Sequence, residues 1–260
     1  IYDTNQATLD RIAAGEMPFL ENGADELLRE VLASGRLEFG ADGAIIQRTN
    51  QLIVVIGTPV DEFLGPSMTV FEKAVNQIAP HLRDGSLVVL RSTVYPGTTE
   101  YVTQHLQEAG CTVDVAFCPE RIAEGHALEE LHSLPQIVGA DDDVAAGRAA
   151  ALFSHVATKT IRTSSKEAEL AKLFTNTWRY MKFAVANQFL MIADQAGVDY
   201  TNVLRAVRED YPRAKDLPGP GFAAGPCLFK DTMQLAAFTS DHFPLGQSAM
   251  PGPGRSFARG

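Results

Sequence analysis

One cysteine of this chain stands where a reactive thiolate can form. Cys227 follows a glycine-rich loop, residues 219–225, and Pro226 can open a helix at this point. Glycines let a backbone approach a ligand closely, and the unpaired amides of a first helical turn favour a negatively charged sulfur. Lys230 and Asp231 follow three and four residues later, on the same helix face. The pattern predicts a nucleophilic cysteine; a buried cysteine in a capping turn is the alternative.

Two further pairs of polar residues have spacings suited to chemistry. Lys172 and Asn176 lie one helical turn apart, so both can donate hydrogen bonds to one developing oxyanion. Removing such a donor commonly costs about two or three orders of magnitude in rate. Glu120 and Glu124 follow an expected strand and can lie on one side of a turn. A surface lysine with a capping asparagine, and solvated surface acids, are the alternatives.

The elements that must position these residues follow from the hydrophobic pattern. Short apolar runs alternate with amphipathic stretches over residues 1–163, which predicts an α/β fold with a doubly wound, Rossmann-like parallel sheet. Ligands of such sheets bind beyond the carboxyl ends of the strands. Strands are expected at 52–56, 87–90, 113–117, 136–138 and 159–162, and helices at 69–82, 98–109 and 142–155.

The periodicity becomes helical from residue 164 onward, which predicts an all-α second domain over 164–250. Ser164 or Ser165 is expected to cap a long helix that runs to about residue 196. Its apolar positions favour packing against another helix or another subunit. Shorter helices are expected at 200–208 and 227–238, and residues 251–260 are expected to be a disordered or foreign tail.

Composition excludes several functional classes. The chain has 260 residues, 45% of them hydrophobic, a net charge of -10 and a pI near 5.1, which argues against nucleic-acid or anionic-membrane binding. Three cysteines are too few for a disulfide framework, and no apolar run is long enough to span a membrane. The six histidines lack the spacing of metal ligands, so no metal site is expected. A cytoplasmic location is the simplest expectation.

The segment around Cys227 resembles the catalytic loop of the nucleotide-sugar dehydrogenases, which oxidise UDP-glucose or UDP-N-acetylhexosamines to uronic acids. Further matching motifs occur in the family's order: Gly57-Thr58-Pro59, Ser92-Thr93-Val94, Pro119-Glu120-Arg121 and Glu169-Leu170-Ala171-Lys172. The resemblance implies NAD as cofactor, a UDP-sugar as substrate and a homodimer formed through the 165–196 helix. Arg121 and Val60-Asp61-Glu62 favour the N-acetylhexosamine branch, with UDP-N-acetylmannosamine or UDP-N-acetylglucosamine as substrate.

The same resemblance implies roles for individual residues. Cys227 attacks the sugar C6 aldehyde, Lys172 and Asn176 steady the oxyanion, and Glu120 assists hydrolysis of the thioester. The implied catalytic set is completed by Asp231 and by Thr93, which helps to hold a catalytic water, whereas Thr98 is expected to cap a helix. The implied NAD contacts are Asp3 at the ribose, Thr58, Ser92, Thr93, Glu124 and Lys230. The implied substrate contacts are Glu120, Arg121, Lys172, Asn176, Arg213, Phe222 and Gly225.

The chain also departs from the family pattern. The strand and G-x-G-x-x-G loop expected before Asp3 are absent, as is the domain that closes over the UDP group. The 260-residue chain by itself is therefore expected to bind NAD poorly. Three other interpretations stay open: a UDP-glucose 6-dehydrogenase, a two-electron hydroxyacid dehydrogenase that needs no loop cysteine, and a non-catalytic dimerising fragment.

Overall fold

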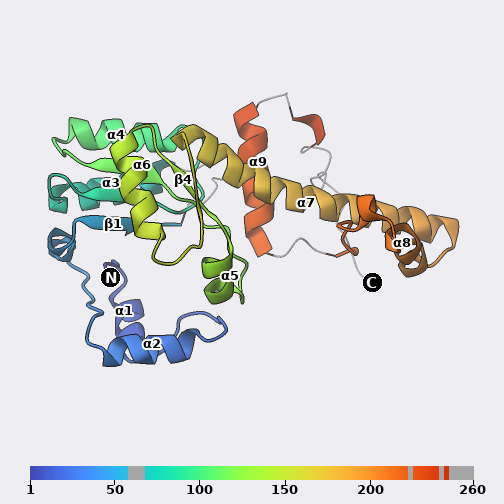
Figure 1. The fold of residues 1–260 in the computed structure, drawn as a ribbon, viewed down its shortest axis with the longest axis horizontal. Helices are drawn as coiled ribbons and strands as arrows, with labels where there is room; N and C mark the ends of the chain where they lie inside the picture. Colours follow the sequence, from blue (N-terminus) through green and yellow to red (C-terminus); the bar gives the residue numbers. More distant parts are fainter. Residues whose placement is uncertain (58–67, 222–224, 240–242, 246–260) are drawn as a thin grey trace. The chain divides into compact units, whose positions relative to one another are not determined.

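The computed structural model describes residues 1–57, 68–221, 225–239 and 243–245. The described residues up to Leu170 form one compact unit, and those from Ala171 onward form a second. The first unit is built around a five-stranded sheet (Figure 1). Its strands lie in the order β1 (Gln51–Val54), β2 (Leu87–Leu90), β3 (Asp114–Phe117), β4 (Gln136–Gly139) and β5 (Thr160–Thr163).

The predicted strands are confirmed within two residues at each end, and so is the Rossmann-like α/β fold. β1 lies at one edge of the sheet and pairs with β2. The pairs β1–β2, β2–β3 and β4–β5 are parallel.

One pair corrects the prediction of a fully parallel sheet: β3 and β4 are antiparallel and meet at Phe117 and Gly139. The connection between them contains α5 (Ala127–Ser133), a helix of seven residues. Gln136, the first residue of β4, donates a hydrogen bond from Nε2 to the carbonyl of Pro119, just after β3 (3.1 Å). The chain thus leaves and re-enters the sheet at the same end, which makes the next strand antiparallel.

Helices cover the sheet because its central strands are apolar on both faces. Leu87 and Val89 of β2 pack against Ala149 and Phe153 of α6 (Asp143–Phe153). The other β2 side chains are also buried and, by the alternation of a strand, face the opposite side. α3 (Met68–Ile78) and α4 (Thr98–Glu108) complete the helices predicted between the strands (Figure 1).

The expected helix at 69–82 is shorter than predicted. α3 ends at Ile78, and a 3-10 turn, η2 (Ala79–His81), follows it. Pro80 lies in this turn and has no N–H to continue the α-helical hydrogen bonds. The proline therefore explains the early end.

The N-terminal segment contains α1 (Gln6–Ala13), α2 (Ala24–Ala33) and a 3-10 helix, η1 (Gly43–Arg48). Asn5 caps α1, because its side chain accepts the Thr8 N–H at 3.2 Å. Tyr2 pairs with Gly40 in an isolated parallel bridge. Asp3 thus follows a strand-like residue and precedes a helix.

The predicted long helix is confirmed as α7 (Ser165–Ala196), with 32 residues. Ser164 and Glu167 form a capping box at its start: the Glu167 N–H donates to Ser164 Oγ (3.3 Å), and the Ser164 N–H donates to the Glu167 carboxylate (3.0 Å). α8 (Tyr200–Arg208) has the predicted bounds. η3 (Pro212–Ala214) follows, and α9 (Gly225–Thr239) begins two residues before the predicted start.

Candidate active-site residues

The second unit brings predicted catalytic residues of α7 and α9 together. Asn176 donates a hydrogen bond from Nδ2 to Oδ2 of Asp231 at 2.5 Å. Lys172 lies one turn before Asn176 on α7. All three side chains are buried, with exposed fractions of 9% for Lys172, 6% for Asn176 and 1% for Asp231. Lysine and aspartate are rarely buried without a partner. In a low-dielectric interior the interactions among such polar side chains are stronger than in water.

Cys227 is the third residue of α9, so its backbone stands in the first helical turn, as predicted. Gly225 opens the helix. The side chain of Cys227 and the whole of Phe222 lie outside the described residues.

The glycine-rich loop before this helix is fastened to α7 by a residue that sequence analysis missed. Asn187 accepts the Gly221 N–H at its Oδ1 and donates from Nδ2 to the Gly221 carbonyl, both at 2.8 Å. Asn187 lies eleven residues after Asn176, which is about three helical turns, so the two asparagines share one face of α7. The spacing is the only sequence signal that points to it.

Arg213 has a neighbour that the sequence did not suggest. Its Nε donates to the Tyr211 hydroxyl at 2.9 Å, and its guanidinium lies 4.9 Å from the centre of the Tyr211 ring. The arginine is exposed in η3. Lys230 lies in α9 and is half-buried.

The other two cysteines have raised pKa values. Burial raises the pKa of Cys118 to about 12, although the nearby positive charge of Arg91 acts in the opposite direction. Burial, and then the charge of Asp84, raise the pKa of Cys111. A reactive cysteine needs a lowered pKa, so neither thiol is suited to act as a nucleophile.

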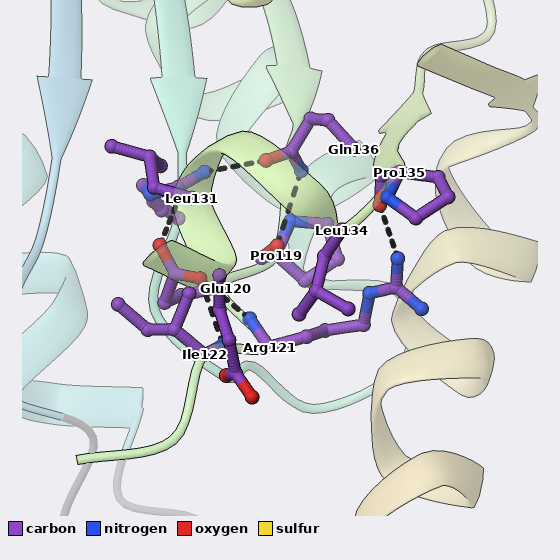
Figure 2. Close-up of a pocket in the computed structure, with 10 residues that line it drawn as sticks. Pro119, Glu120, Arg121, Ile122, Leu131, Leu134, Pro135 and Gln136 are labelled. Carbon is purple, nitrogen blue, oxygen red and sulfur yellow. Dashed lines mark hydrogen bonds and ion pairs between the residues drawn. The ribbon is translucent and has the colours of Figure 1, made fainter. Parts of the chain in front are cut away.

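Glu120 lies just beyond β3, and both of its carboxylate oxygens are held (Figure 2). Oε1 accepts the N–H groups of Arg121 (2.7 Å) and Ile122 (3.0 Å). Oε2 forms an ion pair with Arg91, which directly follows β2. The sequence analysis did not select Arg91 as a site residue. The feature that could have indicated it is a charged residue immediately after a strand of four buried apolar residues.

The neighbouring Arg121 turns toward the chain before β4 (Figure 2). Its guanidinium donates to the carbonyl of Pro135. Burial lowers the pKa of Arg121, and the charge of Glu120 partly opposes this effect. The side chains of Glu120, Arg121 and Gln136 line a small pocket at this end of the sheet.

Two residues of the N-terminal segment, Glu21 and Asn22, hold the turn that carries Glu124 through hydrogen bonds to its backbone. Glu21 accepts the N–H groups of Gly125 (2.9 Å) and Ala127 (2.8 Å) with its two carboxylate oxygens. Asn22 donates to the Gly125 carbonyl at 2.8 Å. Glu124 itself is exposed, so these hydrogen bonds fix its backbone and leave its carboxylate at the surface.

The predicted cofactor contacts in the first unit occupy loop positions. Ser92 Oγ accepts the Ile56 N–H at 2.8 Å, which joins the loops after β1 and β2. Thr93 is half-buried in the loop before α4. The exposed carboxylate of Asp3 accepts the Asn5 N–H at 2.8 Å. Thr58, like residues 60–62, lies outside the described residues.

The start of α4 corrects one prediction and reveals a buried carboxylate. Gly97, with φ of 95°, is the cap of α4, and Thr98 is its first helical residue. Glu169 of α7 accepts hydrogen bonds from the Gly97 N–H (2.6 Å), the Thr99 N–H (2.8 Å) and the Thr99 hydroxyl (2.6 Å). Glycine tolerates this positive φ without strain, which is why it replaces the predicted cap. Burial raises the pKa of Glu169 and outweighs these hydrogen bonds.

A Rossmann-like α/β unit followed by an all-helical unit is an architecture of NAD-dependent dehydrogenases. Residues 1–157 match the NAD-binding domain of the UDP-glucose/GDP-mannose dehydrogenase family, and residues 166–248 match its central domain. The chain therefore belongs to this family.

Named relatives agree with this assignment. The chain is 32% identical to a UDP-N-acetyl-D-mannosamine dehydrogenase of Pyrococcus horikoshii over 94% of its own length and 59% of that protein. It is 31% identical to an NDP-N-acetyl-D-galactosaminuronic acid dehydrogenase of Ralstonia nicotianae, over 88% of the chain and 56% of that protein. The chain thus spans less than two thirds of the length of these relatives.

Solved structures support the same fold. A structure of the UDP-D-ManNAc dehydrogenase of Pyrococcus horikoshii superimposes with a TM-score of 0.89 at 29% identity, covering 95% of this chain and 60% of that one. Within the described residues, no helix is both long and apolar enough to cross a membrane.

Proposed function

We propose that the protein oxidises the C6 hydroxyl of a UDP-N-acetylhexosamine to a carboxylate in two successive NAD-linked steps. The observation that carries this proposal is the buried contact between Asn176 and Asp231, with Lys172 one turn away and Cys227 in the first turn of α9. A buried lysine and amide suit an oxyanion, and a helix start suits a thiolate. The relatives named for N-acetylated sugar substrates favour the same substrate class.

Residues of the first unit fit an NAD cofactor. An acidic residue after a strand-like segment is where a dinucleotide fold holds the adenosine ribose, and Asp3 has this position with an exposed carboxylate. We propose that Ser92, Thr93 and Glu124 also contact the cofactor, and that Thr58 and Lys230 do so as well. NAD, when bound, accepts one hydride from C6 in each oxidation.

In the first oxidation, we propose that Lys172 and Asp231 hold the water that accepts the hydroxyl proton, with help from Thr93. Cys227 then adds to the C6 aldehyde, and a sulfur–carbon bond forms. Lys172 and Asn176 donate hydrogen bonds to the resulting oxyanion, which a buried, preorganised pair stabilises strongly. The second oxidation converts this thiohemiacetal into a thioester.

Hydrolysis of the thioester completes the reaction. Water adds to the carbonyl carbon, the carbon–sulfur bond breaks, and Cys227 leaves as a thiolate. We propose that Glu120 and Asp231 assist this step as proton acceptors. Arg121, Arg213, Phe222 and Gly225 are proposed to contact the substrate.

We also propose that the protein forms a homodimer through α7. Large apolar side chains of this helix are partly exposed at helical spacing, with exposed fractions of 55% for Phe174, 57% for Trp178, 46% for Phe189 and 59% for Ile192. An exposed apolar stripe of this kind marks an interaction surface.

The test is the yield of NADH from the full-length polypeptide that contains this chain. NADH formed per sugar consumed is measured with UDP-N-acetylmannosamine and then with UDP-N-acetylglucosamine. Two NADH per sugar are expected. One NADH would indicate a two-electron alcohol dehydrogenase, and none with either sugar would contradict the proposed substrate class.

The cysteine is tested separately. Cys227→Ala should abolish uronic acid formation, because the aldehyde then has no thiol to form the thioester. Full conversion to the uronic acid by this variant would refute the covalent mechanism.

A further inference from the structure

We infer that Arg91 is a positioning residue that fixes the carboxylate of Glu120 for thioester hydrolysis; this inference rests on the proposed function. The ion pair between the two side chains holds Oε2 of Glu120, while the backbone of Arg121 and Ile122 holds Oε1. Charge-assisted hydrogen bonds of this kind fix both the position and the plane of a carboxylate. The side chain of Glu120 is 33% exposed, so it combines a fixed orientation with access to solvent.

Arg91 is itself fixed on every side. Only 8% of the residue is exposed. Its Nη1 donates to the Cys118 carbonyl (3.2 Å) and to Oε1 of Gln136 (2.9 Å), and its guanidinium lies 4.9 Å from the centre of the Phe153 ring. A planar guanidinium with several donors can satisfy these partners and a carboxylate together, which a lysine ammonium does less well.

Gln136 connects this support to the backbone. Its side-chain Nε2 donates to the carbonyls of Pro119 (3.1 Å) and Ile137 (2.8 Å), while its Oε1 receives Arg91. Arg91 follows β2, Pro119 lies two residues after β3, and Gln136 begins β4, so the network lies at one end of three adjacent strands. Groups held on such a scaffold are preorganised for catalysis.

The step that depends on this orientation is the attack of water on the thioester. A carbon–oxygen bond forms, the carbon–sulfur bond breaks, the sulfur leaves as thiolate, and the proton of the water passes to Glu120. Without Arg91, one carboxylate oxygen loses its anchor and the side chain can rotate. A displacement of about 1 Å at a reacting group can cost ~10²-fold in rate.

The first experiment uses Arg91→Met in the full-length polypeptide, with stopped-flow detection of NADH. We expect kcat to fall by ~10²-fold and KM to fall with it, so that kcat/KM is nearly unchanged, because only hydrolysis of the accumulated thioester is slowed. A burst of two NADH per active site should precede the slow phase, and intact-mass measurement should show the acyl group on Cys227. Arg148→Met is the matched control, because it removes another partly buried arginine–carboxylate pair, to Asp114, in the same unit. The control should show no burst and an unchanged kcat.

A double-mutant cycle separates positioning from general destabilisation. If Arg91 acts through Glu120, Arg91→Met combined with Glu120→Gln should be no slower than Glu120→Gln alone. A further ~10²-fold loss in the double variant would overturn the inference, as would an unchanged kcat or a slow Arg91→Met variant without a burst.

If Arg91→Met does not fold, the measurement is repeated with Arg91→Lys. For this variant we expect an NADH burst and a kcat between those of wild type and Glu120→Gln, whereas a wild-type kcat would overturn the inference. If the wild-type polypeptide forms no NADH with either sugar, the proposed function fails and the inference with it. Two NADH from wild type and normal hydrolysis by both Arg91 variants would overturn the inference alone.

Discussion

Glu169 should be one of the most sensitive stabilising residues of the first unit. Only 1% of the residue is exposed, and its carboxylate accepts three hydrogen bonds at the start of α4. Replacing it by alanine removes the acceptor for two backbone amides, those of Gly97 and Thr99. A negative charge at a helix N-terminus is also favourable, and the variant loses that interaction.

The expected cost follows from these contacts. A buried donor left unsatisfied costs about 1–3 kcal/mol, so two amides give roughly 2–6 kcal/mol. The Thr99 hydroxyl can rotate to another acceptor and adds little. Removing a buried carboxylate also relieves its desolvation, which places the expected loss in the lower part of the range, about 2–4 kcal/mol. Glu169→Gln keeps one acceptor oxygen and should lose about 1–2 kcal/mol.

Urea unfolding followed by circular dichroism measures the loss, and amide hydrogen exchange at Gly97 and Thr99 locates it. Lys166→Ala is the control, because this exposed residue lies on the same turn of α7 and should change stability by less than ~0.5 kcal/mol. If Glu169→Ala unfolds within ~0.5 kcal/mol of wild type, with both amides still protected, the buried contacts do not stabilise α4 as argued.

Three further predictions concern α7. Hydrogen bonds to Glu167, of which that from Thr163 has the largest effect, lower the pKa of this carboxyl to about 2. The stability that the ionised carboxylate contributes is therefore complete above the unfolded-state pKa of about 4.3 and is lost as pH falls toward 2. The difference in unfolding free energy between wild type and Glu167→Gln should shrink between pH 6 and pH 3, and a constant difference would contradict this. Trp178→Glu should convert the proposed dimer to monomers, as measured by light scattering. Burying the exposed half of the Trp178 side chain, roughly 100–150 Å², is worth about 3 kcal/mol per protomer. A persistent dimer would place the interface elsewhere. Asn187→Leu should speed hydrogen exchange of the Gly221 amide by removing its acceptor, and unchanged exchange would show that the loop is held without it.

The sequence predicted those elements whose signals are local. The run Leu87–Leu90 is apolar at every position, as a strand buried on both faces requires, and it was predicted with its exact bounds. α7 was predicted because its helical periodicity extends over 32 residues. α1 was not delimited, because it has eight residues and Leu9 is the one that is buried, which leaves almost no periodic signal.

The sequence did not predict contacts that arise from strand adjacency. Arg91 and Gln136 are 45 residues apart in sequence, and they meet because β2 and β4 flank β3 and both residues stand at the same end of the sheet. The antiparallel β3–β4 pair was not predicted either, because the apolar runs of parallel and antiparallel strands look alike when both faces are buried. Asn176 and Asp231 were placed in one site by motif resemblance, and the structure adds that they contact each other directly.

The edge position of β1 has a practical consequence for handling the protein. Ile53 is 42% exposed and Val55, just after the strand, is 70% exposed. A sheet edge with exposed apolar side chains is a template for pairing with another chain and a frequent origin of aggregation. The 260-residue chain should therefore self-associate through β1 at high concentration, and Ile53→Lys should raise its solubility limit by placing a charge on that edge.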